Sequence, residues 1–76
     1  MTTAEVIQSA ADHHNAIKAN VDNWYSDAID HATFSANQRR LWDEAHAKGR
    51  DWEGVLLAVM RGDEADALAY AAKVAR

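Results

Sequence analysis

Apolar and semi-polar residues recur with heptad spacing along the N-terminal part of the chain. They alternate at intervals of three and four residues, at Ile7, Ala10, His14, Ile17, Val21, Trp24, Ala28 and His31. This spacing places them on one helix face and resembles the seam of a coiled coil. Thr2 and Glu5 fit a capping box, in which a Thr and a Glu three residues later satisfy backbone donors at a helix start. We therefore predict a long N-terminal helix over about residues 3–31.

The weakest part of this helix is the segment Asn20–Asn23. Asn and Asp side chains compete for the hydrogen bonds that hold a helix together, and this segment contains three of them. An unbroken helix would be a rod of about 43 Å. The sequence leaves open whether the helix is straight or kinked at this segment.

Three shorter helices are expected after it, over about residues 36–48, 52–61 and 64–75. Ser35, Asp51 and Asp63 are their expected N-caps. Gly49 and Arg61-Gly62 are expected to end the first two of them. Their inward positions are predicted to be Leu41, Trp42, Ala45, Trp52, Val55, Leu56, Val59, Met60, Leu68, Ala71, Ala72 and Ala75.

The loops between these helices are short, so neighbouring helices must fold back on one another. The predicted fold is all-α, a small helical bundle in which three short helices pack on a long or kinked N-terminal helix. With 76 residues the chain forms a single domain over residues 1–76. The absence of Pro and the small number of Gly, three in all, agree with this fold class.

Composition narrows the chemistry that the chain can carry. There is no Cys, which excludes disulfides, Cys-ligated metals and a cysteine nucleophile. No apolar run approaches the length of about 20 residues that spans a bilayer, and the first residues do not resemble a signal peptide. We therefore expect a cytoplasmic protein with no membrane association.

Negative charge is concentrated in the first half of the chain. Residues 1–35 carry five acidic residues and one Lys, for a net charge of −4, whereas residues 36–76 carry seven of each sign. The five acidic residues fall away from the heptad seam, at Glu5, Asp12, Asp22, Asp27 and Asp30. Such a row either keeps a small protein in solution or steers it toward a Lys/Arg-rich partner. Direct nucleic-acid binding is not expected of an acidic surface.

Trp24 and Tyr25 are adjacent, and adjacent side chains of a helix point about 100° apart. They cannot both face one core, so one is expected at a surface, where Tyr and Trp are favoured in binding sites. We select Tyr25 as the aromatic anchor of a partner-binding face that also contains Glu5, Asp12, Asp22, Asp27 and Asp30.

Three other interpretations have less support. His31 and His46 follow Asp27 and Asp43 at spacings used in metal sites, but the inward Glu residues of a di-iron bundle are missing. No spacing typical of a catalytic triad or a phosphate-binding loop is present, so no catalytic residue and no cofactor are expected. A helix-turn-helix skeleton around Ala45 and Gly49 has charged residues where it needs apolar ones.

Residues 62–70 look like the second half of a tetratricopeptide repeat. Gly54 stands where the first half of such a repeat has a large apolar residue, and no second copy follows at a spacing of about 34 residues. We therefore interpret this region as a generic helical hairpin.

The sequence favours a non-enzymatic protein-binding module that covers a partner's surface, such as a phage or mobile-element inhibitor of a host system. Anti-CRISPR proteins belong to that class, which includes many compact, acidic, cysteine-free helical proteins of this length. One alternative is a structural homodimer or assembly subunit that pairs along the Ile7–His31 seam. The other is a His/Asp metal-binding protein.

Overall fold

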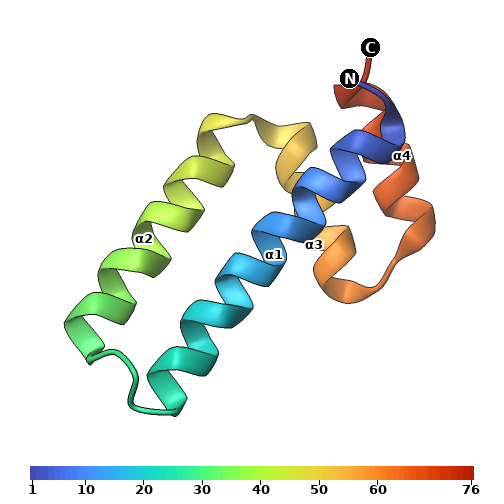
Figure 1. Ribbon diagram of the computed structural model, residues 1–76. Coiled ribbons are helices and arrows are strands. Elements are labelled where there is room, and N and C mark those ends of the chain that lie inside the picture. The colour runs from blue at the N-terminus through green and yellow to red at the C-terminus, as the bar shows by residue number, and fades with distance from the viewer.

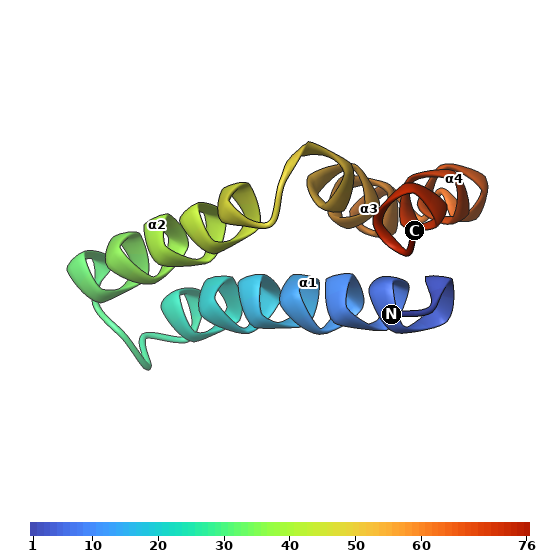
Figure 2. The same cartoon turned by 90° about the horizontal axis from the view of Figure 1, so that it is seen from above.

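The computed structural model describes all 76 residues and contains four helices and no strand. The helices are α1 (Thr3–Tyr25), α2 (His31–Ala47), α3 (Arg50–Arg61) and α4 (Glu64–Val74). They form two antiparallel hairpins, and the α3–α4 hairpin packs against the N-terminal half of α1 (Figures 1 and 2). The predicted all-α bundle built on a long N-terminal helix is confirmed. None of the helices combines the length and apolar character needed to cross a lipid bilayer.

The molecule is elongated because the α1–α2 hairpin projects beyond the second hairpin (Figure 1). Its principal extents are 40 × 22 × 16 Å, and its radius of gyration is 13.3 Å. A compact domain of this length has a radius of gyration of about 11 Å. The distal half of the α1–α2 hairpin is therefore only two helices thick.

Helix α1 begins at the predicted capping box. The Thr2 backbone N–H donates to Glu5 Oε1 at 2.9 Å, and the Glu5 N–H donates to Thr2 Oγ1 at 3.1 Å. The helix continues unbroken through Asn20–Asn23, and its ribbon is straight in Figures 1 and 2. It ends at Tyr25, six residues earlier than predicted.

The chain leaves α1 because a turn captures the last backbone groups of the helix. The Asn23 carbonyl accepts hydrogen bonds from the N–H groups of Ala28 and Ile29, at 2.8 and 3.3 Å. Asp27 has a φ of 63°, a left-handed conformation that Asp tolerates better than most residues. Asp30 then caps α2, so the Ser35 cap predicted from sequence is wrong and Ser35 lies inside the helix.

The buried face of α1 is displaced from the predicted seam by one residue at three places. Val6, His13 and Asn20 occupy the positions expected for Ile7, His14 and Val21, which lie at the edge of the contact and are half-buried. Ala10 and Ile17 are buried as predicted. The difference arises because α2 and α3 contact α1 from different directions, so the contact face is wider than one seam.

The core is centred on α3. Trp52, Val55 and Leu56 are buried as predicted, together with Leu41 and Ala45 of α2. The prediction was wrong for three inward positions, since Met60, Leu68 and Ala72 are exposed. Helix α4 turns Ala71 inward as predicted, together with Ala67, and Tyr70 and Val74 pack beside the core.

Gly54 explains how α4 approaches α3. A Cβ atom built at Gly54 would lie 2.5 Å from Cδ1 of Tyr70. The missing side chain lets the Tyr70 ring pack directly against the α3 backbone. This packing rotates α4 relative to the sequence-based prediction and leaves Leu68 facing solvent.

Glycines delimit α3. Gly49 precedes the helix with a φ of 101° and provides no side-chain cap, so the predicted start at residue 52 is two residues late and Asp51 is not the N-cap. Gly62 ends the helix in the left-handed conformation, as predicted. Asp63 is the N-cap of α4, as predicted, and its carboxylate accepts from the Asp66 N–H at 3.0 Å.

Candidate protein-binding surface at the hairpin tip

The distal end of the α1–α2 hairpin carries negative charge and no Lys or Arg. We call residues 20–38 the hairpin tip: the end of α1, the connecting turn and the first half of α2. It contains three acidic residues, Asp22, Asp27 and Asp30, and no Lys or Arg, for a net charge of −3. The α3–α4 hairpin does not cover this end (Figures 1 and 2). A binding partner can therefore reach it directly.

A group of aromatic rings holds the two helices together at the tip. The Trp24 and Phe34 rings stack with their centroids 4.4 Å apart and an interplanar angle of 18°. The ring centroids of His31 and Trp24 lie 5.7 Å apart, with an interplanar angle of 66°. Trp24 is half-buried and Tyr25 is 76% exposed, so the expectation that one of these two aromatic residues lies at the surface is confirmed.

Asn20 links α1 to α2 through a buried polar network. It is 5% exposed, and its Nδ2 donates to the Phe34 carbonyl at 3.1 Å and to Gln38 Oε1 at 3.0 Å. Its Oδ1 accepts from Asn37 Nδ2 at 3.0 Å. Both ends of the Asn20 amide are therefore satisfied, which fixes the register of the hairpin. The sequence offered one signal for this residue, since Asn20 follows Ile17 at the three-residue spacing of a buried face.

The tip carboxylates are not neutralised by any cation. Neither Asp22, Asp27 nor Asp30 forms an ion pair with Lys or Arg. Asp22 and Asp27 are exposed, whereas the Asp30 carboxylate accepts from the Thr33 N–H at 2.8 Å. Their negative charge is therefore available to an approaching molecule.

Two of the six predicted binding residues lie away from the tip. Glu5 is in the capping box at the opposite end of α1, and its pKa is lowered chiefly by the hydrogen bond from the Thr2 backbone. Asp12 lies midway along α1 and accepts from Gln8 Nε2 at 2.8 Å. The structure thus brings together Asp22, Tyr25, Asp27 and Asp30, and separates Glu5 and Asp12 from them.

Asp30 makes the hairpin turn sensitive to acid. Hydrogen bonds from the Thr33 side chain and then its backbone hold the pKa of Asp30 below its ordinary value of 3.8. A lowered pKa stabilises the fold above the unfolded-state value, and this stabilisation is lost as the pH falls through the folded-state value. Asn caps helices about as well as Asp but does not titrate. We expect Asp30→Asn to flatten the acid side of the curve of melting temperature against pH, between about pH 5 and 2.

The matched control for this prediction is Asp43→Asn on α2. It removes the same charge at an exposed position that caps no helix. Its melting curve should keep the acid dependence of the unmodified chain. Parallel curves for Asp30→Asn and the unmodified chain would show that the cap contributes no acid sensitivity.

The histidines form separate contacts. The His13 ring Nε2 lies 2.7 Å from the Leu41 carbonyl oxygen, with its edge toward Trp52. His46 Nδ1 lies 2.7 Å from Glu53 Oε1. Nowhere in the chain do three or more His, Asp or Glu side chains converge as a metal site would require. The Asp27–His31 and Asp43–His46 spacings noted in the sequence therefore do not assemble into such a group.

Comparison with known proteins gives no further guide to the site. The chain matches no protein-family model, no curated protein and no solved structure. The chemistry of the hairpin tip is the basis for the proposal below.

Proposed function

We propose that this chain is a non-enzymatic protein-binding module that covers a basic surface of its partner with the hairpin tip. One observation carries the proposal: Tyr25, 76% exposed, lies in a segment with a net charge of −3 and no Lys or Arg. An exposed aromatic residue within one sign of charge combines a contact anchor with electrostatic attraction.

The tip is well ordered for this task. The Asn20 network and the Trp24–Phe34 stack hold its two helices in one register. A surface that is already ordered loses less conformational entropy on binding. The unpaired carboxylates would accelerate association with Lys/Arg-rich surfaces and make it sensitive to salt.

Within this class we favour a phage or mobile-element inhibitor of a host system, of which anti-CRISPR proteins are an example. A host protein that binds nucleic acid has the basic surface that the tip would fit, and the carboxylates would compete there with phosphates. An inhibitor of this kind acts in the cytoplasm. Glu5 and Asp12 lie on α1 away from the tip and are not part of the contact proposed here.

The homodimer alternative uses the same helix differently. Ala10 and Ile17 are buried inside the chain, so pairing along the full Ile7–His31 seam would have to displace helices of the bundle. The mass in solution distinguishes the two functions, because the docking module is a monomer without its partner.

The proposal is tested by capture of the tagged chain's partner from its native host, followed by affinity measurements. We expect Asp22→Lys combined with Tyr25→Ala to weaken binding at least about 100-fold, since a central aromatic anchor contributes about 2 kcal/mol or more and the reversed charge adds to the loss. Asp43→Lys on α2 is the control, with an equal charge change at an exposed site outside the tip. Its affinity should change less than about threefold.

Helicity separates loss of binding from loss of folding. Asp22 and Tyr25 are both exposed, so the circular dichroism spectrum of the double variant should match that of the unmodified chain. Unchanged affinity of the folded double variant, or an equal loss with Asp43→Lys, would contradict the proposal.

A further inference from the structure

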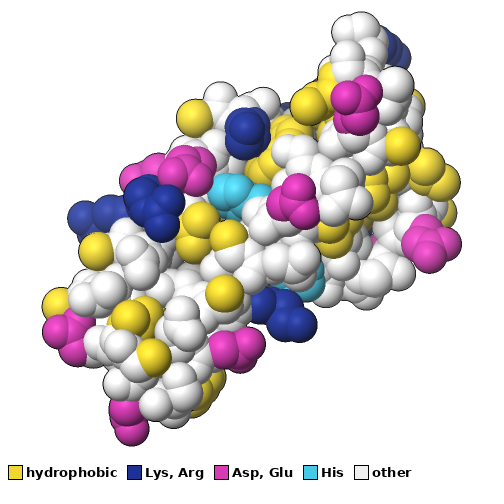
Figure 3. Space-filling view, in the orientation of Figure 1, with side chains coloured by type: hydrophobic (Ala, Val, Ile, Leu, Met, Phe, Trp, Pro, Cys, Tyr) yellow, Lys and Arg dark blue, Asp and Glu magenta, His cyan; other side chains and the backbone are white.

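A second surface lies at the other end of the molecule, where α1 crosses the α3–α4 hairpin. It is an open groove of about 460 Å³ with apolar walls from Ile7, Ala58, Val59, Ala67 and Leu68. Figure 3 shows apolar side chains concentrated over this end of the molecule, whereas charged side chains of both signs lie over α2. Leu68 is 54% exposed although it forms part of the groove wall.

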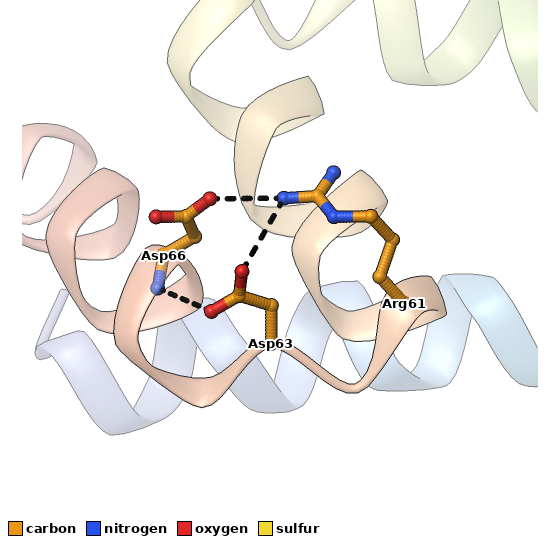
Figure 4. A network of polar contacts seen from close by, with 3 residues as sticks. All are labelled: Arg61, Asp63 and Asp66. Atoms are coloured by element: carbon orange, nitrogen blue, oxygen red, sulfur yellow. Dashed lines mark hydrogen bonds and ion pairs between the residues drawn. The ribbon is translucent and has the colours of Figure 1, made fainter.

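The turn that borders the groove carries a small network of polar contacts. Arg61 lies between two carboxylates, with its Nη2 atom 3.0 Å from Asp66 Oδ2 and 4.0 Å from Asp63 Oδ2 (Figure 4). Asp63 also caps α4 through the Asp66 N–H. These contacts join the end of α3 to the start of α4, beside the groove.

The charge at the groove is negative. The only charged residues that line it are Asp63 and Glu64. Arg61 is the nearby cation, but its guanidinium is already shared between Asp63 and Asp66. Glu64 forms no ion pair and is exposed. An occupant with Lys or Arg beside its apolar contacts would therefore complement the groove.

A second copy of this chain fits these features poorly. A symmetric pair would bring the same patch of each copy together, and the residues that line the groove include Asp63 and Glu64 but no Lys or Arg that could pair with them across the interface. The net charge of −4 adds to that repulsion. A small apolar ligand also fits poorly, because ligand sites enclose most of their ligand, and a wall that is half exposed does not.

We propose that the groove formed by Ile7, Ala58, Val59, Ala67 and Leu68 binds an amphipathic protein segment carrying an apolar anchor and flanking Lys or Arg. The apolar side chain enters between Ile7 and Leu68, and the basic residue pairs with Glu64. In a known mode of peptide recognition, an amphipathic helix lies with its apolar face in a hydrophobic groove. This surface is separate from the hairpin tip, so the module has two docking surfaces at opposite ends.

The test is a selection of random 16-residue peptides displayed against the full chain, followed by affinity measurements on an enriched peptide. Enriched peptides should share an apolar anchor with nearby Lys or Arg, and should shift the amide signals of Ile7, Val59 and Leu68 in nuclear magnetic resonance spectra. Leu68→Ser should weaken binding about tenfold, and Glu64→Lys about fivefold.

Matched controls isolate the groove from general effects. Leu57→Ser changes an exposed leucine of α3 that does not line the groove, and Asp43→Lys repeats the charge change elsewhere. Both variants should bind the peptide with the affinity of the unmodified chain. Asp22→Lys at the tip should do so as well, so this test of the groove does not depend on the function of the tip.

Several outcomes would overturn the proposal. They are a selection that enriches no peptide or only acidic ones, signals that shift outside the groove, and a Leu68→Ser variant that binds normally. Concentration-dependent shifts of the free chain at the same residues would assign the groove to a second copy instead.

Discussion

Replacing Trp52 with alanine is expected to lower the free energy of unfolding by about 3–5 kcal/mol. The whole stability of a 76-residue domain is about 4–11 kcal/mol, so this one change removes a large part of it. Trp52 is 4% exposed and lies in the core cluster formed by all four helices. Few other side chains in so small a core contribute a comparable apolar area.

The loss should reach beyond α3 because Trp52 supports its neighbours. The ring centroids of His13 and Trp52 lie 5.3 Å apart in a T-shaped arrangement, and His13 also contacts the Leu41 carbonyl. Lys48 Nζ lies 5.2 Å from the indole centroid. Removing the indole therefore weakens the contact of α3 with both α1 and α2.

Urea unfolding followed by circular dichroism measures this effect. Leu57→Ala is the control, since Leu57 is on the same helix and is 44% exposed. It should cost less than about 1 kcal/mol. A Trp52→Ala variant as stable as Leu57→Ala would show that the core is not centred on this indole.

The features that the sequence predicted correctly are those set by short-range chemistry. The Thr2–Glu5 capping box and the left-handed Gly62 depend on neighbouring residues alone, and both were found where expected. The continuous apolar stretch of α3 also identified Trp52, Val55 and Leu56 as core residues. Helix type and number follow from such local signals.

The features that were missed depend on how helices meet in space. Nothing near Leu68 in sequence shows that Tyr70 packs on Gly54 and rotates α4. The contact face of α1 contains Val6, His13 and Asn20 where the sequence predicted their neighbours Ile7, His14 and Val21. This difference depends on the two directions from which α2 and α3 approach α1. Such choices are made by tertiary packing, which overrides the local pattern.

The candidate site also has one part that the sequence predicted and one part that it did not. The tip residues Asp22, Tyr25, Asp27 and Asp30 lie within nine residues of one another, so their proximity follows from the sequence. The network around Asn20 does not, because it joins that residue to Phe34, Asn37 and Gln38 across the turn. The segment Asn20–Asn23 suggested a break in α1, but its residue Asn20 forms the hydrogen bonds that link α1 to α2.

Replacing Asn20 with aspartate tests this role of the network directly. The change keeps the size of the side chain but replaces its donor Nδ2 with an acceptor oxygen. The ionised carboxylate would then face the Phe34 carbonyl, which cannot donate, in a site that is 5% exposed. We expect a loss of about 3 kcal/mol or more of unfolding free energy at pH 7, because the buried charge keeps only the Asn37 amide donor and has no cation to pair with.

The pH dependence of this loss identifies its cause. Burial and the facing carbonyl both disfavour the ionised form, so the pKa of the introduced carboxyl should be raised in the folded state. A raised pKa means that stability is greatest below the unfolded-state value and is lost as the pH rises through the folded-state value. The Asn20→Asp variant should therefore lie closest to the unmodified chain near pH 3–4 and fall away toward pH 7.

Asn15→Asp is the matched control, because it makes the same change at an exposed position of α1. It should alter stability by no more than about 0.5 kcal/mol at either pH. Equal stabilities of the two variants at pH 7, or a loss in Asn20→Asp that does not depend on pH, would contradict the network. A pH-dependent loss confined to Asn20→Asp would show that one buried amide keeps the acidic tip in a single shape, which is the property that a rigid docking surface needs.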